Sequence, residues 1–245
     1  MVPFKNSRII LIAAAFACFN FTFGQFTGGG RLGINASNLR GSSVQNNSML
    51  IGYNIGGFVN AGGEDILKGD IADILSLQVE LTVESKGAKM DYPTIAKAED
   101  TLVPNVISSK LNLTYVTIPL LAKFNFGEKK GINYFAEAGF YGAGLFGVTV
   151  DGEKKYDHDY DATTDRRNYR DDFDGFDLGI IFGGGASIPF GGRKSPWRAY
   201  GNLRYSMGLS SVGEKREGTP DSYAAYVEDI KVSAISLLFG VMYKF

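Results

Sequence analysis

Three glycines in the segment "FYGAGLFGVTVDG" have the spacing of a dinucleotide-binding fingerprint, Gly142-x-Gly144-x-x-Gly147. In Rossmann enzymes such glycines follow a strand and open a helix, whose N-terminus holds the pyrophosphate. Here the chain continues with β-branched residues into a turn at Asp151 and Gly152, without a helical period. We therefore interpret the glycines as part of a coiled strand, where they permit close approach of neighbouring strands, and we expect no bound cofactor.

A second candidate is an acidic motif with the opening spacing of an EF-hand calcium loop, Asp157-x-Asp159-x-Asp161. An EF-hand also requires a glycine at its sixth position and a bidentate glutamate at its twelfth. Ala162 and Asn168 occupy these two positions, so the EF-hand match fails.

The region from Asp151 to Asp172 around this motif carries eight acidic and five basic residues, a net charge of −3. A solvated loop is the favoured interpretation, and a looser extracellular calcium site is the alternative. His158, the only histidine in the chain, lies in this region. Because a multi-histidine zinc site needs several histidines and a histidine triad needs one beside its nucleophile, we expect neither a metal site nor catalytic residues.

Glu80 and Glu137 could in principle form the acid and base of a hydrolase. Both lie on the polar faces of alternating segments, as do Arg31 and Arg204. An unpaired charge in a narrow interior is costly, so we expect the two carboxylates to pair with Arg31 or Arg204 instead.

The elements that position these residues show an alternation of apolar and polar side chains, which is the period of a β-strand. In the segment "DILSLQVELTVESKG", for example, Leu77 and Val79 alternate with polar neighbours. Eight such segments cover residues 31–36, 51–60, 73–87, 111–126, 132–147, 178–190, 197–209 and 235–245. In the fourth segment the alternation changes phase near Pro119, which predicts a bulge or an edge irregularity because proline provides no ladder donor.

The N-terminus has the order of features that defines a secretory signal peptide. Lys5 and Arg8 precede the apolar run "IILIAAAFACF", and small residues follow around Gly24. We predict a signal peptide over residues 1–24 and a barrel domain over residues 25–245. Cleavage would remove Cys18, the only cysteine, and Phe16 argues against a lipoprotein signal that ends at Cys18.

The polar face of the predicted strands is rich in Gly, Ser and Asn and carries single charges such as Arg31 and Asp177. A solvated exterior would carry more Lys and Glu and fewer glycines. Small residues around mixed charges suit a crowded interior, so the apolar face would point to lipid. We therefore predict an all-β fold, an eight-stranded antiparallel up-and-down transmembrane β-barrel.

Connection lengths agree with this fold, because outer-membrane barrels have short turns on one side and long loops on the other. Short turns are predicted at "GEKKG" and "GGRKSP", while "NAGGEDILKGDIAD" on the same side is longer. Long loops are predicted over residues 39–49, 86–109, 148–172 and 210–229.

The mature chain resembles the PorT-like outer-membrane β-barrel family of Gram-negative bacteria in segments such as "RLGINASNLRG", "LSLQVELTVESKGA", "LTYVTIPLLAKFNFG", "NYFAEAGFYGAGLFG" and "DLGIIFGGGASI". The most specific parts are "ESKGA" and "IPLLAKF". The resemblance implies a barrel in the outer membrane, with Phe245 as the terminal aromatic residue that the barrel-assembly machinery recognises. Some members of the family are linked to protein secretion.

Two classes of function follow. The first is a noncatalytic outer-membrane barrel with a filled lumen and long extracellular loops, acting in envelope integrity, adhesion or as a secretion accessory. Its partners would be outer-membrane lipid and an external or secretion-system protein, contacted through tyrosines of the 151–172 region, whereas a net charge of −1 gives no general attraction to nucleic acid. The second is a small lipid-modifying enzyme, which the single histidine disfavours. A soluble lipocalin-like barrel is a third alternative.

Overall fold

The computed structural model describes residues 26–41, 47–63, 71–72, 74–98, 101–127, 131–157, 166–168, 170, 173–191, 195–213 and 230–245. The predicted signal peptide lies outside these residues, as do His158, Asp159 and Asp161. In the part of the chain that is described, no helix is long and apolar enough to cross a membrane.

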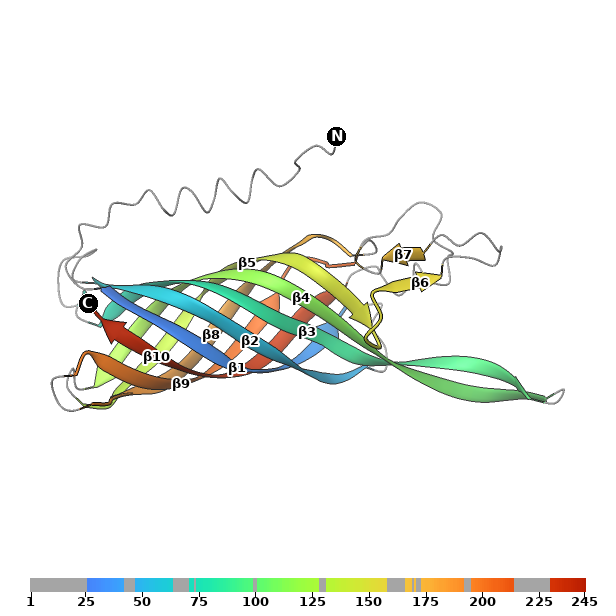
Figure 1. Ribbon diagram of the computed structural model, residues 1–245, viewed down its shortest axis with the longest axis horizontal. Coiled ribbons are helices and arrows are strands. Elements are labelled where there is room, and N and C mark those ends of the chain that lie inside the picture. The colour runs from blue at the N-terminus through green and yellow to red at the C-terminus, as the bar shows by residue number, and fades with distance from the viewer. Residues whose placement is uncertain are drawn as a thin grey trace, which may run out of the picture.

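Eight antiparallel strands close into a barrel in the order β1-β10-β9-β8-β5-β4-β3-β2, which confirms the predicted fold class (Figure 1). The strands are β1 (Phe26–Arg40), β2 (Asn47–Gly62), β3 (Leu75–Ala98), β4 (Thr101–Gly127), β5 (Asn133–Val150), β8 (Phe176–Pro189), β9 (Trp197–Gly208) and β10 (Lys231–Lys244). A small hairpin of β6 (Lys155–Asp157) and β7 (Arg166–Asn168) lies within the connection from β5 to β8, which the sequence suggested to be a solvated loop.

Closure depends on the first and last strands. β1 pairs with β10 along its length, from Thr27↔Lys244 to Arg40↔Lys231. The amide of Phe245 extends this contact by donating to the carbonyl of Phe26 at 2.8 Å. Since a closed sheet has no exposed edge, every strand of the wall has a ladder partner on both sides.

Side chains alternate across the wall as the sequence predicted. Leu32 and Phe140 point outward and are 63% and 69% exposed, whereas Arg31 and Glu80 point inward and are 5% and 2% exposed. A soluble lipocalin-like barrel would require the opposite arrangement, with apolar residues inside. The structure therefore rules out that alternative and gives the outer wall of a membrane barrel.

The two ends of the barrel differ. The turn end holds Phe26, Phe245 and the connections at residues 63–74, 128–132 and 190–196, and the loop end holds the connections at residues 41–46, 99–100, 151–175 and 209–230. The long loop predicted over residues 86–109 is wrong, because β3 and β4 form a paired ladder as far as Ala98↔Thr101. The pairs from Asp91↔Ser108 to Ala98↔Thr101 extend this ladder past the last pairs with β2 and β5. Figure 1 shows this extension projecting beyond the loop end of the barrel.

The structure shows no bulge at Pro119, but it confirms the alternative, an irregularity of the ladder at this residue. Inward and outward residues alternate without interruption from Leu111 to Phe124, and the register shift between β4 and β5 lies at Thr114/Tyr115 instead. The effect of Pro119 is local: the β3–β4 ladder omits its pairing with Glu80, where a donor from Pro119 would be needed. The change of phase in the sequence came from apolar side chains that face the lumen.

A second irregularity lies between β2 and β3, whose register shifts between Met49 and Asn54. Two side chains of β1 reach the unpaired backbone there. The Asn35 amide donates to the carbonyls of Tyr53 and Ser85 at 3.2 and 3.3 Å. The Ser37 hydroxyl accepts from the amide of Gly87 at 2.8 Å and lies 3.0 Å from its carbonyl. Side chains thus replace part of a ladder that the backbone leaves open.

The outward facing of Leu237 generates a test. The residue is 41% exposed and pairs with Ile34 and Leu203, both also outward-facing. Leu237→Arg should lower the free energy of unfolding by roughly 2–4 kcal/mol if the position faces mid-membrane lipid. Denaturant unfolding in phospholipid vesicles measures the change, with Leu237→Ala as the control for truncation without charge. Equal stability of the two variants would contradict the assigned facing.

Candidate functional site in the charged lumen

The centre of the lumen is organised by Glu80, which is held by two arginines. The Arg31 guanidinium lies 2.9 Å from Oε1 and 2.7 Å from Oε2. The Arg204 guanidinium approaches the same carboxylate from β9, at 2.8 Å to Oε2 and 3.1 Å to Oε1. Gln78 donates a further hydrogen bond to Oε1 at 2.5 Å. Both oxygens of Glu80 are therefore occupied by charge-assisted contacts.

Arg204 also links Glu80 to Glu137. Its Nε donates to Glu137 Oε1 at 2.6 Å, and the Asn202 amide donates to the same oxygen at 2.8 Å. The other oxygen, Oε2, has no hydrogen-bond partner. The prediction that Glu80 and Glu137 pair with Arg31 or Arg204 is confirmed, and one arginine serves both carboxylates.

Lys123 occupies the same layer without an ion pair to any described carboxylate. Its Nζ donates to Gln78 Oε1 at 3.1 Å and lies 3.9 Å from the centroid of the Phe135 ring. Glu137 is its direct register partner across β4 and β5, yet that carboxylate turns toward Arg204. Contact with an aromatic face stabilises the buried ammonium in the absence of a carboxylate.

A second polar layer lies closer to the loop end. Lys86 Nζ contacts Glu84 Oε1 at 2.6 Å, and Glu84 also accepts hydrogen bonds from Asn54 and Thr117 at 2.9 and 2.8 Å. Lys86 Nζ lies 4.8 Å from the centroid of the Tyr141 ring.

Asp177 lies beside this layer and accepts a hydrogen bond from the Tyr141 hydroxyl at 2.8 Å. Its second oxygen has no partner, and neither has the hydroxyl of the fully buried Tyr115.

The buried charges of the described lumen balance. Four cationic side chains face four carboxylates: Arg31, Lys86, Lys123 and Arg204 against Glu80, Glu84, Glu137 and Asp177. A neutral set of this kind creates no general field that would draw cations or anions into the barrel. Ion pairs among six of the eight, all but Lys123 and Asp177, offset part of the cost of burying the charges.

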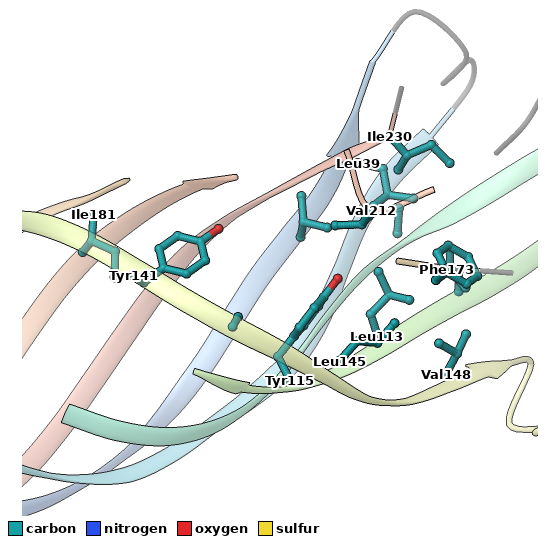
Figure 2. Packing of buried hydrophobic residues seen from close by; sticks show 14 of the residues in the cluster. Leu39, Leu113, Tyr115, Tyr141, Leu145, Val148, Phe173, Ile181, Val212 and Ile230 are labelled. Carbon is teal, nitrogen blue, oxygen red and sulfur yellow. The ribbon is translucent and has the colours of Figure 1, made fainter. Parts of the chain in front are cut away.

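Apolar side chains close the lumen at the loop end. Figure 2 shows wall residues such as Leu39, Leu113 and Tyr115 gathered with Phe173, Val212 and Ile230 from the connections. The connecting segments are anchored there, because the Val212 amide donates to the Ile230 carbonyl at 2.7 Å and the Asp174 amide to the Val212 carbonyl at 2.9 Å. This loop-end cluster places buried, packed apolar side chains between the charged layers and the loop end.

A smaller apolar layer closes the lumen toward the turn end. Phe58, Phe135 and Tyr200 form a buried cluster against which Met242 packs. The rings of Phe58 and Tyr200 meet edge to face, with centroids 5.6 Å apart. The charged layers thus lie between two apolar layers.

Arg198 lies at the turn end and is half-buried, not part of the central network. Its Nε donates to Ser187 Oγ at 3.1 Å, and its Nη2 donates to the carbonyls of Gly131 and Ser187 at 2.8 and 2.9 Å.

The three fingerprint glycines lie in β5, as the sequence predicted, but their expected role was wrong in one respect. Gly142, Gly144 and Gly147 stand opposite Ile118, Val116 and Thr114 of β4. A Cβ added at Gly144 or Gly147 would meet no atom within 4 Å, so close strand approach does not require glycine at these two positions. Gly147 instead lies where the register shifts, beside the exposed Phe146.

The acidic candidates are not brought together in the part of the chain that the structure describes, where no group of three His, Cys, Asp or Glu side chains could hold a metal ion. Asp159, Asp161 and His158 lie outside the described residues. Asp151 lies at the end of β5 and binds β4, with its carboxylate accepting hydrogen bonds from the Lys110 amide and the Ser109 hydroxyl at 2.8 and 2.7 Å.

Sequence reasoning missed several lumen residues. Lys86 and Lys123 were not identified from the sequence. Lys86 is an even-numbered residue of β3, like the inward-facing Glu80, and Lys123 is at one of the odd-numbered positions of β4 that face inward. Strict alternation along β3 and β4 would have identified them. The loop-end cluster had no such signal, because Phe173, Val212 and Ile230 belong to connections without a period.

An outward apolar wall and an inward network of paired charges define an integral outer-membrane β-barrel. The chain belongs to the family described as outer membrane protein beta-barrel domain, whose model matches residues 19–214. Membership places the protein in the outer membrane, where the short turns of such barrels face the periplasm. A search of curated proteins gives no match.

Several solved structures are similar to the chain. Neisserial surface protein A is 12% identical, with 91% of this chain and 99% of that chain covered and a TM-score of 0.43. The outer membrane protein OprG from Pseudomonas aeruginosa is 10% identical, with 91% and 96% covered and a TM-score of 0.43. Ail, the attachment invasion locus protein of Yersinia pestis, solved in complex with the heparin analogue sucrose octasulfate, is 9% identical, with 90% and 99% covered and a TM-score of 0.39.

The shared carboxylate of Glu80 predicts a large effect of its removal. Glu80→Gln should lower the free energy of unfolding by about 3–5 kcal/mol, because it leaves two buried arginines short of a counter-charge. Lys123→Met, which removes a cation that forms no ion pair with a described carboxylate, should cost clearly less. Urea unfolding in vesicles, followed by the fluorescence of Trp197, compares the two. A larger loss for Lys123→Met would show that Glu80 does not organise the lumen.

Proposed function

We propose that the protein is a noncatalytic, nonconducting outer-membrane barrel whose loop end binds an external protein or a component of a secretion assembly. The observation that carries this proposal is the lumen, which is filled by paired charges between two apolar layers. Such a lumen leaves no wide aqueous path. The surfaces available to other molecules are then the lipid-facing wall and the loop end.

The lumen chemistry supports a noncatalytic role over a lipid-modifying enzyme. A general base needs a free lone pair within reach of its substrate. Both oxygens of Glu80 accept hydrogen bonds from arginine. Glu137 has an unpartnered Oε2, but Arg204 and Asn202 hold its other oxygen and the side chain is buried inside the wall, out of reach of a lipid. Neither carboxylate faces the lipid, where a lipid substrate would have to bind.

A closer relation to PorT-like barrels, and with it a secretion-accessory role, rests on two segments of the sequence. The segments "ESKGA" and "IPLLAKF" occupy adjacent strands, with Glu84 in β3 and Lys123 in β4 both facing the lumen. Their side chains contribute to both charged layers. The inferred role is attachment of a secretion component or an adhesive partner at the loop end.

Crosslinking in intact envelopes tests the loop-end role. Met90 and Ser109 are register partners, so an Asn-Gly turn joining them removes the β3–β4 extension and leaves the barrel wall unchanged. We expect this variant to lose the protein crosslinks that a photoreactive residue at the loop end gives in the full chain. A variant that joins Ala96 to Val103 in the same way removes only the tip and should keep them. Unchanged crosslinks in the first variant would refute the proposal.

We also propose that the assembly machinery recognises the C-terminal strand through Phe245. This ring is 75% exposed and meets Tyr243 edge to face at 4.9 Å between centroids, while Tyr243 meets Trp197 at 5.0 Å. Deletion of Phe245 should slow insertion into the outer membrane, because the last ladder contact and the exposed aromatic ring are both lost. Pulse-chase measurement of the folded fraction follows the rate, with Phe245→Tyr as the conservative control. Equal rates for the deletion and the full chain would argue against this recognition.

A further inference from the structure

Both edges of the β3–β4 extension lack a described ladder partner. β2 pairs with β3 only as far as Asn47↔Met90, and β5 pairs with β4 only as far as Leu111↔Val150. Eight further register pairs, Asp91↔Ser108 to Ala98↔Thr101, form a two-stranded ribbon beyond these limits. An isolated two-stranded ribbon is marginally stable in water, and a third strand would stabilise it.

The hydrogen bonds of Lys110 show which residues of β4 direct their backbone N–H and C=O groups toward the outer edge. The amide of Lys110 donates to Asp151 Oδ1 at 2.8 Å, and its carbonyl accepts from the Asp151 amide at 2.9 Å. Both groups of Lys110 therefore point away from β3. In an antiparallel ladder this direction recurs at every second residue, so the residues of β4 that face the outer edge are Leu102, Pro104, Val106 and Ser108.

The positions of the prolines agree with this assignment. Pro104, and Pro93 on β3, stand in pairs whose amides point out of the ribbon, so neither interrupts its ladder. Pro119 is at one of the odd-numbered positions of β4, whose backbone groups point toward β3, and it does interrupt the ladder to β3. On each edge, proline removes one outward donor, which limits long or open-ended pairing with other strands.

Asp151 marks where the free edge of β4 begins. It occupies the amide and carbonyl of Lys110, and hydrogen bonds from the Lys110 amide and the Ser109 hydroxyl lower the pKa of its carboxyl. Immediately beyond it, Ser108 and Val106 each present an unpaired N–H and C=O within the described ladder, and Pro104 follows with a C=O only. The result is a short free strand edge that starts at the barrel rim and could pair with a further strand.

We propose that this edge of β4, from Pro104 to Ser108, binds a short extended segment of a partner polypeptide by strand addition. The unpaired N–H and C=O groups define the partner's chemistry, because only another extended backbone offers donors and acceptors at matching spacing. Pro104 sets the length, since pairing past it loses a donor. The inference rests on the proposed function and names the site and the class of partner at the loop end.

The test removes or adds single edge amides without changing the ribbon. Val106→Pro deletes an outward N–H at a position equivalent to that of Pro104, and Val106→Ala keeps the N–H as the matched control. Pro104→Val adds an outward N–H. The probe is a displayed library of random nonapeptides, selected on the full-length protein in lipid nanodiscs. Peptides enriched on the natural chain should bind Val106→Ala within about threefold, Val106→Pro at least about tenfold more weakly, and Pro104→Val more tightly.

Amide hydrogen exchange supplies a second readout, because the bound peptide should slow exchange at Val106 and Ser108 but not at residues of the turn end. Equal binding to the natural chain and Val106→Pro, or no enrichment of any peptide, would overturn the proposal. A dimer of the natural chain that Val106→Pro dissociates would identify a second copy as the occupant, which also overturns it. If envelope crosslinks are lost on removal of the extension yet persist in Val106→Pro, the loop-end function stands and strand addition is wrong.

Discussion

A backbone N–H or C=O left unpaired in hydrocarbon costs several kcal/mol, so a sheet that spans a membrane has to close on itself. Here β1 meets β10 along its whole length, and two of the three irregularities of the wall show how an interruption is handled locally. Asn35 and Ser37 bind the backbone that β2 leaves open, and the ladder skips the pair at Pro119. Outside the membrane the constraint relaxes, which is why Pro93 and Pro104 are tolerated on a ribbon with free edges.

Closure of an eight-stranded wall leaves room for side chains only, and this fixes the chemistry of the interior. Inward positions have to be polar enough for the alternating pattern and mutually paired, because isolated charges could not be buried. Glu80 satisfies two arginines, Arg204 satisfies two carboxylates, and Lys123 rests on an aromatic ring. Buried apolar clusters then lie on both sides of this network, one toward the loop end and one toward the turn end.

The period of two in the sequence predicted the eight wall strands, their facing and the pairing of Glu80 and Glu137 with arginine. It failed where apolar residues face inward: Leu113 and Leu121 blurred the alternation of β4 and suggested a bulge that is absent. The β3–β4 extension was missed because Pro93 and Pro104 indicate a loop. Only the register shows that the backbone N–H of both positions would point out of the ribbon, so that the β3–β4 ladder does not need it. The loop-end cluster depends on tertiary packing of connections, which no local pattern encodes.

The balance of buried charge has a mechanical consequence. The formal charges of the four buried cations and four buried carboxylates sum to zero, so an electric field along the barrel axis exerts no net force on this set. Such a field can act only on the dipole of the set, by pulling positive and negative groups in opposite directions. Lys123 lies in the layer nearer the turn end, and Asp177 lies nearer the loop end. The interior can therefore contain many charged side chains, and a membrane potential would not displace this set as a unit along the barrel axis.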